Sequence, residues 1–278
     1  RTQQCDVMLC AYASHGDTRH PILFPANPHE CFEMAVAVFD LAERLQTPVF
    51  LASDLDIGMN DWMVPELTWD DSYRPDRGKV LGPEELKKME RFVRYLDVDG
   101  DGIAYRTLPG EDPKGAYFVR GSGHNRYGAY TEDSDEYQDI MDRLLVKWEK
   151  AKTMVPDAIL SKAKRKTGLG ILAFGSSDGA VIEARDSLEA EGIFADYLRI
   201  RAFPFSAEVV EFLHSHETIF VVEQNRDAQM KSLLMLEAND IADRLVSVLH
   251  YNGLPIPSDC VVQGVTEHLK KVKKEAVA

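Results

Sequence analysis

The second half of the chain alternates between apolar runs and helix-like segments, and this alternation constrains the fold more than any other feature. Strand-like runs are found at 168–177, 195–203 and 218–225. Helix-like segments follow them at 178–191, 206–216 and from 226 onward. Regular strand–helix alternation predicts an open, largely parallel sheet with helices on its faces. Ligands of such sheets bind at the loops after the carboxyl ends of the strands.

The first half carries another strand–helix–strand pattern. Residues 8–13 suit a short strand, and residues 48–54 suit a buried parallel strand. Between them Asn27, Pro28 and Glu30 predict a helix start with a capping box, and the helix runs to about residue 45. That helix is apolar almost all round, so we expect a sheet on one side and another domain or subunit on the other. The fold class is therefore α/β.

The middle of the chain is less regular. A helix is expected from residue 82 to about 96, and a second one begins at Asp133. The Gly-, Asp- and Tyr-rich loops between them are of a length typical of functional or interfacial segments. Pro156 and the polar stretch 161–168 mark a linker, so we expect two domains, 1–158 and 159–278.

Charge and cysteine usage exclude several classes of function. The net charge is −14, which argues against nucleic acid and anionic membranes as partners. The four cysteines, at positions 5, 10, 31 and 260, are too scattered to build a zinc or iron–sulfur site. Scattered free thiols are typical of a cytoplasmic protein, which is the localisation that we expect.

Two acidic or polar loops are candidates for chemistry. His15 and Asp17 follow the first expected strand, where His15 can move a proton or donate to a developing anion; the alternative is a histidine that only hydrogen-bonds the turn. The sequence DVDGDG at 97–102 resembles the start of a calcium loop. Its twelfth position is Leu108 instead of an acid, so Asx hydrogen bonds in a turn are the favoured interpretation and a metal stays an alternative.

Three further features have a functional and a structural interpretation each. Gly175, Ser176 and Ser177 precede a helix and can hold an anion or form an ordinary turn. Glu223 ends an apolar run and can act as an acid or cap the next helix, and the 214–216 histidines close a helix. A dinucleotide fingerprint is absent, which weakens a Rossmann-like nucleotide-binding hypothesis.

The sequence also resembles a known family. The stretches RTQQCDVMLCAYASHGD at 1–17 and ECFEMAVAVFDLAERLQTPVFLASDLDIGMNDWM at 30–63 are similar to the pyrimidine-type thiamine-diphosphate-binding domain of 2-oxoacid:ferredoxin oxidoreductase α subunits. The segments at 94–110 and 117–133 resemble its later part, in a subset often assigned to 2-oxoglutarate. Residues from 168 onward resemble the transketolase C-terminal-like domain that follows, with an open, mainly parallel sheet.

The resemblance implies oxidative decarboxylation of a 2-oxoacid with coenzyme A to acyl-CoA, CO2 and reduced ferredoxin. Thiamine diphosphate with Mg2+ would lie at the interface with a β subunit, which would also carry the iron–sulfur cluster and pass electrons to ferredoxin. No metal would be bound by this chain alone. The implied assembly is a cytoplasmic hetero-oligomer, with a homodimeric α contact inside a heterotetramer.

The resemblance also assigns roles to individual residues. Arg1, as a planar fork, would hold the 2-oxo carboxylate, with Thr2 at the same pocket edge, while His15 and Asp17 would orient substrate or assist proton movement. The family's YPITP loop and cofactor-activating glutamate would precede Arg1 and are not in the sequence, so cofactor-binding residues stay unassigned. We therefore expect a fragment of the α subunit that is inactive alone, with or without a fused γ domain upstream.

A non-catalytic assembly module of a multi-subunit complex is the alternative function. It would explain the apolar helix at 28–45 and the tyrosine-rich loops. The sequence leaves open which 2-oxoacid is used.

Overall fold

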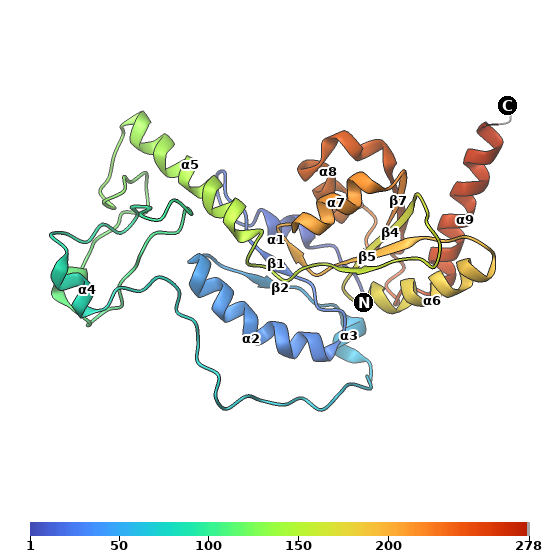
Figure 1. The fold of residues 1–278 in the computed structure, drawn as a ribbon, viewed down its shortest axis with the longest axis horizontal. Helices are drawn as coiled ribbons and strands as arrows, with labels where there is room; N and C mark the ends of the chain where they lie inside the picture. Colours follow the sequence, from blue (N-terminus) through green and yellow to red (C-terminus); the bar gives the residue numbers. More distant parts are fainter. Residues whose placement is uncertain (277–278) are drawn as a thin grey trace.

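The computed structural model describes residues 1–276, which form two α/β units and a projecting lobe (Figure 1). In the described residues the strands form two sheets, of order β2-β1-β6 and β3-β5-β4-β7-β8. The confirmed α/β fold therefore has a small sheet early in the chain and a larger one late in it. None of the described helices is long and apolar enough to cross a membrane.

The larger sheet has the predicted, largely parallel character. Its neighbouring strands are parallel except for β3, which is antiparallel to β5. The strands are β3 (Ile159–Ser161), β4 (Leu169–Phe174), β5 (Asp196–Ile200), β7 (Thr218–Glu223) and β8 (Leu245–Leu249). Side chains of β4 alternate between the two faces, so Ile171 and Ala173 join one core cluster while Leu172 and Phe174 join another.

Helices cover both faces of this sheet. On one face lie α6 (Ser177–Ala190) and α9 (Ser258–Glu275), whose apolar side chains pack with Ile171 and Phe220. On the other lie α7 (Ala207–Ser215) and α8 (Gln229–Glu237), followed by the 3-10 helix η2 (Asn239–Arg244). Both faces are thus buried, as the continuous apolar runs predicted.

The smaller sheet differs more from the expectations. Its strands are β1 (Ile22–Leu23), β2 (Phe50–Leu51) and β6 (Ala202–Phe203), with β1 parallel to β2 and antiparallel to β6. The buried strand expected at 48–54 is only two residues long, and Leu51 is 36% exposed. The strand expected at 8–13 is wrong, because residues 7–11 form the helix α1 (Val7–Ala11). Val7 and Ala11, four residues apart, are its buried side chains, and α1 packs against α8.

The predicted helix between these strands is confirmed. It is α2 (Pro28–Leu45), and Asn27 Oδ1 accepts a hydrogen bond from the Glu30 N–H at 2.9 Å. In a capping box the Glu30 carboxylate would accept from the Asn27 N–H. Here it accepts from the N–H of the preceding residue, Ala26, at 2.9 Å. One face of the helix is buried, whereas Phe39 is 70% exposed. The second covering layer expected for this helix is not supplied by residues 1–276.

The lobe lies at the opposite end of the molecule from α9 (Figure 1). Its helices are α4 (Pro83–Lys88), the 3-10 helix η1 (Pro113–Gly115) and α5 (Ser134–Ala151), while α3 (Leu55–Met59) lies beside α2. The helix expected at 82–96 stops at Lys88, because Phe92 and Tyr95 leave the helical path to pack on Tyr117 and His124 of the later loop. Asp133 caps α5 as predicted.

The early and late parts of the chain share one core. A single apolar cluster contains Phe24 and Trp148 as well as Phe174 and Phe205. Beside it, Arg199 of β5 donates to both carboxylate oxygens of Glu30, at 2.6 and 2.8 Å. Both side chains of this ion pair are nearly buried, and so the pair links α2 directly to the larger sheet.

Candidate functional site

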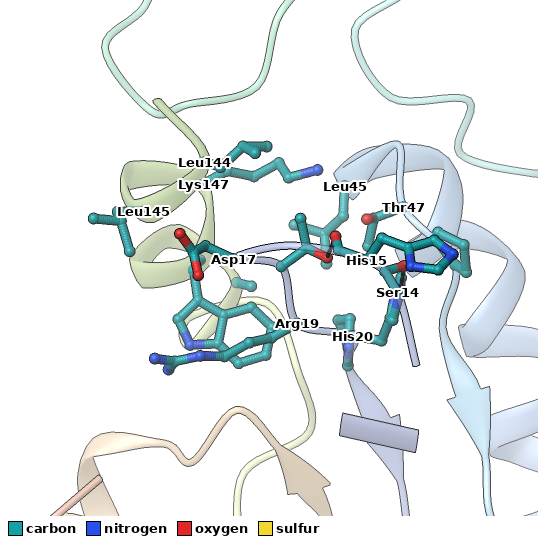
Figure 2. A pocket seen from close by; sticks show the side chains of 15 residues that line it. Ser14, His15, Asp17, Arg19, His20, Leu45, Thr47, Leu144, Leu145 and Lys147 are labelled. Atoms are coloured by element: carbon teal, nitrogen blue, oxygen red, sulfur yellow. Dashed lines mark hydrogen bonds between the residues drawn. The ribbon is translucent and has the colours of Figure 1, made fainter. Parts of the chain in front are cut away.

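A cavity of about 430 Å3 lies between the 14–21 loop, the end of α2 and one side of α5 (Figure 2). His15, Asp17, His20 and Lys147 supply its titratable side chains, together with Arg19. The structure thus brings the two predicted catalytic residues, His15 and Asp17, to one pocket. A concave site with several convergent titratable groups is the arrangement expected of a ligand-binding site.

The loop that carries His15 and Asp17 is a polar turn. Gly16 has φ +72°, a conformation that favours glycine, and the Thr18 hydroxyl donates to the carbonyl oxygen of His15 at 3.3 Å. This hydrogen bond uses the backbone of His15, and the His15 and Asp17 side chains stay exposed. Both groups are therefore accessible to a ligand.

Arg1 and Thr2, the predicted substrate-binding residues, lie at another place. The Thr2 N–H donates to the carbonyl oxygen of Gly253 at 3.2 Å, and the aliphatic part of Arg1 packs over the same glycine. Neither residue lines the cavity that contains His15. Within this chain the four predicted site residues therefore form two separate pairs.

Sequence reasoning missed two residues of the cavity. His20 is buried, and its Nε2 lies 2.5 Å from the Ser14 hydroxyl oxygen. Lys147 reaches the cavity from α5, where burial, together with the charges of Arg143 and Arg94, lowers its pKa to about 8. The only signal in the sequence is that Lys147 stands next to Trp148, inside the apolar stripe of that helix.

A second cavity, of about 270 Å3, lies between α1, the small sheet and the end of β4. At its rim the Ser176 hydroxyl donates to Asp54 Oδ2 at 2.6 Å and accepts from the Gln224 amide at 2.8 Å. The Gly175 to Ser177 turn is thus tied to neighbouring side chains, which favours the ordinary-turn interpretation over an anion site.

Glu223 caps a helix, which was the structural alternative for this residue. Its carboxylate accepts from the N–H groups of Met230 at 2.7 Å and of Lys231 at 3.0 Å, in the first turn of α8. Burial raises its pKa in spite of these hydrogen bonds. The side chain is therefore fully occupied in holding the start of α8.

The acidic DVDGDG loop is also occupied by the protein itself. Asp97 accepts from the N–H groups of Gly100 at 2.9 Å and Gly102 at 2.7 Å, the Asx pattern that the sequence favoured. The Lys79 ammonium lies 2.6 Å from Asp99 and 2.7 Å from Asp101, in the position that a cation would take. Among residues 1–276 no three side chains of the metal-binding types converge on one point.

Comparison with known proteins finds similarity to one family of oxidoreductases. Residues 1–86 match the family model described as pyruvate flavodoxin/ferredoxin oxidoreductase, thiamine diphosphate-binding. The 2-oxoacid:ferredoxin oxidoreductase subunit alpha of Saccharolobus solfataricus is 26% identical over 284 residues, which cover 100% of this chain and 43% of the relative. The chain is similar to these α subunits along its whole length. The corresponding subunit alpha of oxidoreductase 2 from Aeropyrum pernix is 28% identical over 285 residues, which cover 100% of this chain and 42% of the relative.

A solved structure extends the likeness to the fold. The 2-oxoglutarate:ferredoxin oxidoreductase from Magnetococcus marinus, solved with 2-oxoglutarate, coenzyme A and succinyl-CoA bound, has a TM-score of 0.82 and 22% identity. The match covers 96% of this chain and 45% of that chain. This chain thus has the fold of one part of that solved chain, and it spans less than half the length of these three proteins.

Proposed function

We propose that this chain forms part of the α subunit of a thiamine-diphosphate-dependent 2-oxoacid:ferredoxin oxidoreductase. The reaction would convert a 2-oxoacid and coenzyme A to acyl-CoA and CO2 with reduction of ferredoxin. The alignment with such α subunits along the whole chain carries this proposal. The ligands of the solved relative favour 2-oxoglutarate as the substrate.

Thiamine diphosphate would supply the electron sink of the decarboxylation. The most buried carboxylates of residues 1–276 are those of Glu30, Asp196 and Glu223, and all three accept hydrogen bonds from the protein. Because the described residues also bring no metal-ligand cluster together, they do not by themselves fit a metal–diphosphate site. We therefore assign the diphosphate and Mg2+ to a β subunit, which would also hold the iron–sulfur cluster and meet ferredoxin.

The chain's own predicted residues would act on the substrate. Arg1 would hold the 2-oxo carboxylate by a bidentate contact with Thr2 beside it, and His15 with Asp17 would orient substrate or move a proton. Since the two pairs lie apart in this chain, their roles are tested separately.

The test is an assay of the complete complex, purified with its partner subunits. We expect 2-oxoglutarate and coenzyme A together to drive reduction of ferredoxin or a viologen, and thiamine diphosphate to be required. An intact complex that reduces no acceptor with any 2-oxoacid would rule the function out.

The alternative, a non-catalytic assembly module, is favoured by the exposed apolar side chains that follow α3. Met63 and Trp69 lie there, in a segment without helix or strand. If the complex is active but unaffected by changes at Arg1 and His15, this alternative is the better account of the chain.

A further inference from the structure

Three cationic side chains gather beside the cavity that contains His15. They are Arg94, Arg143 and Lys147, and the charges of both arginines act on the lysine. Arg94 donates to the amide oxygen of Gln46 at 2.7 Å and Arg143 to the carbonyl oxygen of Gly102 at 2.8 Å, so both find neutral acceptors. Within residues 1–276 none of the three has a carboxylate oxygen within 4.0 Å. Asp97 and Asp139 act on Arg143 only from longer range, without an ion pair. In a chain of net charge −14, a cation cluster with no ion-paired carboxylate among residues 1–276 points to an anion from outside.

Lys147 is the member of the cluster that reaches the cavity. Its side chain extends from α5 across the cavity (Figure 2), and no hydrogen-bond partner for its amine occurs in the described part of the chain. Lys147 is half-buried, and holding an ammonium in such a place costs free energy unless a counter-charge or hydrogen bonds compensate. The neighbouring arginines add to this cost, which is why its pKa falls to about 8.

The rest of the cavity suits a small ligand with an apolar part. Leu45, Leu144 and Trp148 give it an apolar wall, and the indole Nε1 of Trp148 is buried without a hydrogen-bond partner among residues 1–276. Arg19, which also lines the cavity, is already paired with Glu237 at 2.7 Å. Among residues 1–276, Lys147 is therefore the lysine or arginine of this cavity that has no ion-pair partner, and Asp17 is the acid that shares the cavity with it.

We propose that this cavity binds the oxyanion group of a small ligand, a carboxylate or a phosphate, through Lys147. Arg143 and Arg94 add positive charge behind it, and the apolar wall receives the hydrocarbon part of the ligand. His15 and Asp17, proposed above to act on the substrate, line the same cavity, but the cavity and the cation cluster are present whether or not that activity is found. A bound anion would stabilise the protonated amine, so binding raises the pKa of Lys147 towards that of an ordinary lysine.

The test is a titration of the lysine amines in the full-length protein by NMR after reductive 13C-methylation. Lys147→Met assigns the resonance, and Lys147→Arg is the second assignment variant if the first does not fold. Lys150→Met, which changes an exposed lysine of the same helix, is the control. We expect one resonance to titrate near pH 8, to be absent only in the Lys147 variants, and to move to higher pH when ligand is added.

The ligands are glutarate, phosphate and pyrophosphate, each raised to about 10 mM, well above the Kd of a specific small-anion site. We expect the apparent proton dissociation constant of Lys147 to fall by at least about tenfold, or one pH unit, with at least one of them. A response to glutarate alone identifies a carboxylate site, and a response to the phosphates alone identifies a phosphate site. No response of this resonance to any of the three, or an equal response of Lys150, overturns the proposal. Because the readout is a titration, it is separate from failure of the oxidoreductase assay.

Discussion

At the scale of single residues, Arg1 and His15 test different parts of the proposed chemistry. In the complete complex we expect Arg1→Ala to lower kcat/KM for the 2-oxoacid by roughly 2–4 kcal/mol, the scale of a lost buried charge-assisted pair. Arg1→Lys keeps the charge and loses the bidentate geometry, so its loss should be smaller. His15→Ala should act mainly on turnover. Steady-state kinetics beside a thiamine diphosphate titration measure these effects, and wild-type kinetics in Arg1→Ala would remove that residue from the site.

Glu30 gives a prediction about stability. Glu30→Gln removes the bidentate counter-charge of the buried Arg199 guanidinium and leaves only Asp178, 3.7 Å from its Nε, so the free energy of unfolding should fall by about 3 kcal/mol. Urea unfolding followed by circular dichroism measures it. Glu33→Gln, on the same helix but exposed, is the matched control and should change little.

The pH dependence of the same variant has a definite sign. Burial alone would raise the pKa of Glu30, but hydrogen bonds from Arg199 and from the Ala26 N–H, with the charges of Arg199 and Arg201, hold it below its ordinary value. Its stabilisation is therefore complete above the unfolded-state pKa, about 4.3, and is lost as pH falls through the lower folded-state pKa. Glu30→Gln should flatten the fall of stability below about pH 4. An unchanged acid limb in the variant would contradict the ion-pair account.

At the scale of elements, the later helices and strands were predictable because each has a clear period and flanking signals. β4, α7 and β7 lie where the sequence placed them. The helix α1 was mistaken for a strand, since five residues are too few to separate a period of 3.6 from a period of 2. The helix α4 ends earlier than predicted because Phe92 and Tyr95 contact a loop that comes later in the chain. Local helix propensity contains no information about such contacts.

The contact between the acidic loop and α5 is tested by two glycines with similar backbone conformations. Gly102, at φ +77°, leaves no room for a side chain, because an added Cβ would lie 2.2 Å from the Lys147 backbone nitrogen. Gly100, at φ +73°, has open space around it. Gly100→Ala should therefore cost only the strain of the left-handed conformation, about 1–2 kcal/mol, and Gly102→Ala clearly more. Thermal unfolding of the two variants measures the difference, and equal costs would mean that the loop does not press on α5.

At the scale of the whole molecule, the predicted domain boundary near residue 160 is tested by limited proteolysis. Residues 159–161 are paired in β3, whereas Lys164, Arg165 and Lys166 are exposed just after it. Trypsin should cut first in this segment. Because the two halves share a core, we expect the nicked fragments to stay together in gel filtration and to separate in denaturant. Early cleavage inside 170–225 would contradict the boundary.

Assembly follows from the surfaces that residues 1–276 leave uncovered. Phe39 on α2 and Met63 in the segment after α3 are both largely or fully exposed. Exposed large apolar side chains are typical of interaction surfaces, so the full-length subunit should form an oligomer with a β subunit and a second copy of itself. Light scattering at micromolar concentration measures the mass, and a stable monomer in the presence of its partner would contradict this prediction.

The candidate site was only partly readable from the sequence. The loop with His15 and Asp17 was found because a polar, glycine-containing turn stands out between apolar segments. Lys147 was not found from the sequence, because it is about 130 residues from His15 in the chain. It reaches the same cavity only through the packing of α5. The separation of Arg1 from His15 is likewise a property of tertiary structure, which a linear motif does not record.

The short strand β6 has a consequence for synthesis of the protein. It belongs to the late part of the chain but completes the early sheet by pairing with β1. A growing polypeptide therefore exposes one open edge of that sheet until residues 202–203 have left the ribosome, and such edges invite wrong pairing. We expect stalled nascent chains that end before this point to need chaperones, and to lack the protease resistance of residues 1–86 that longer nascent chains acquire.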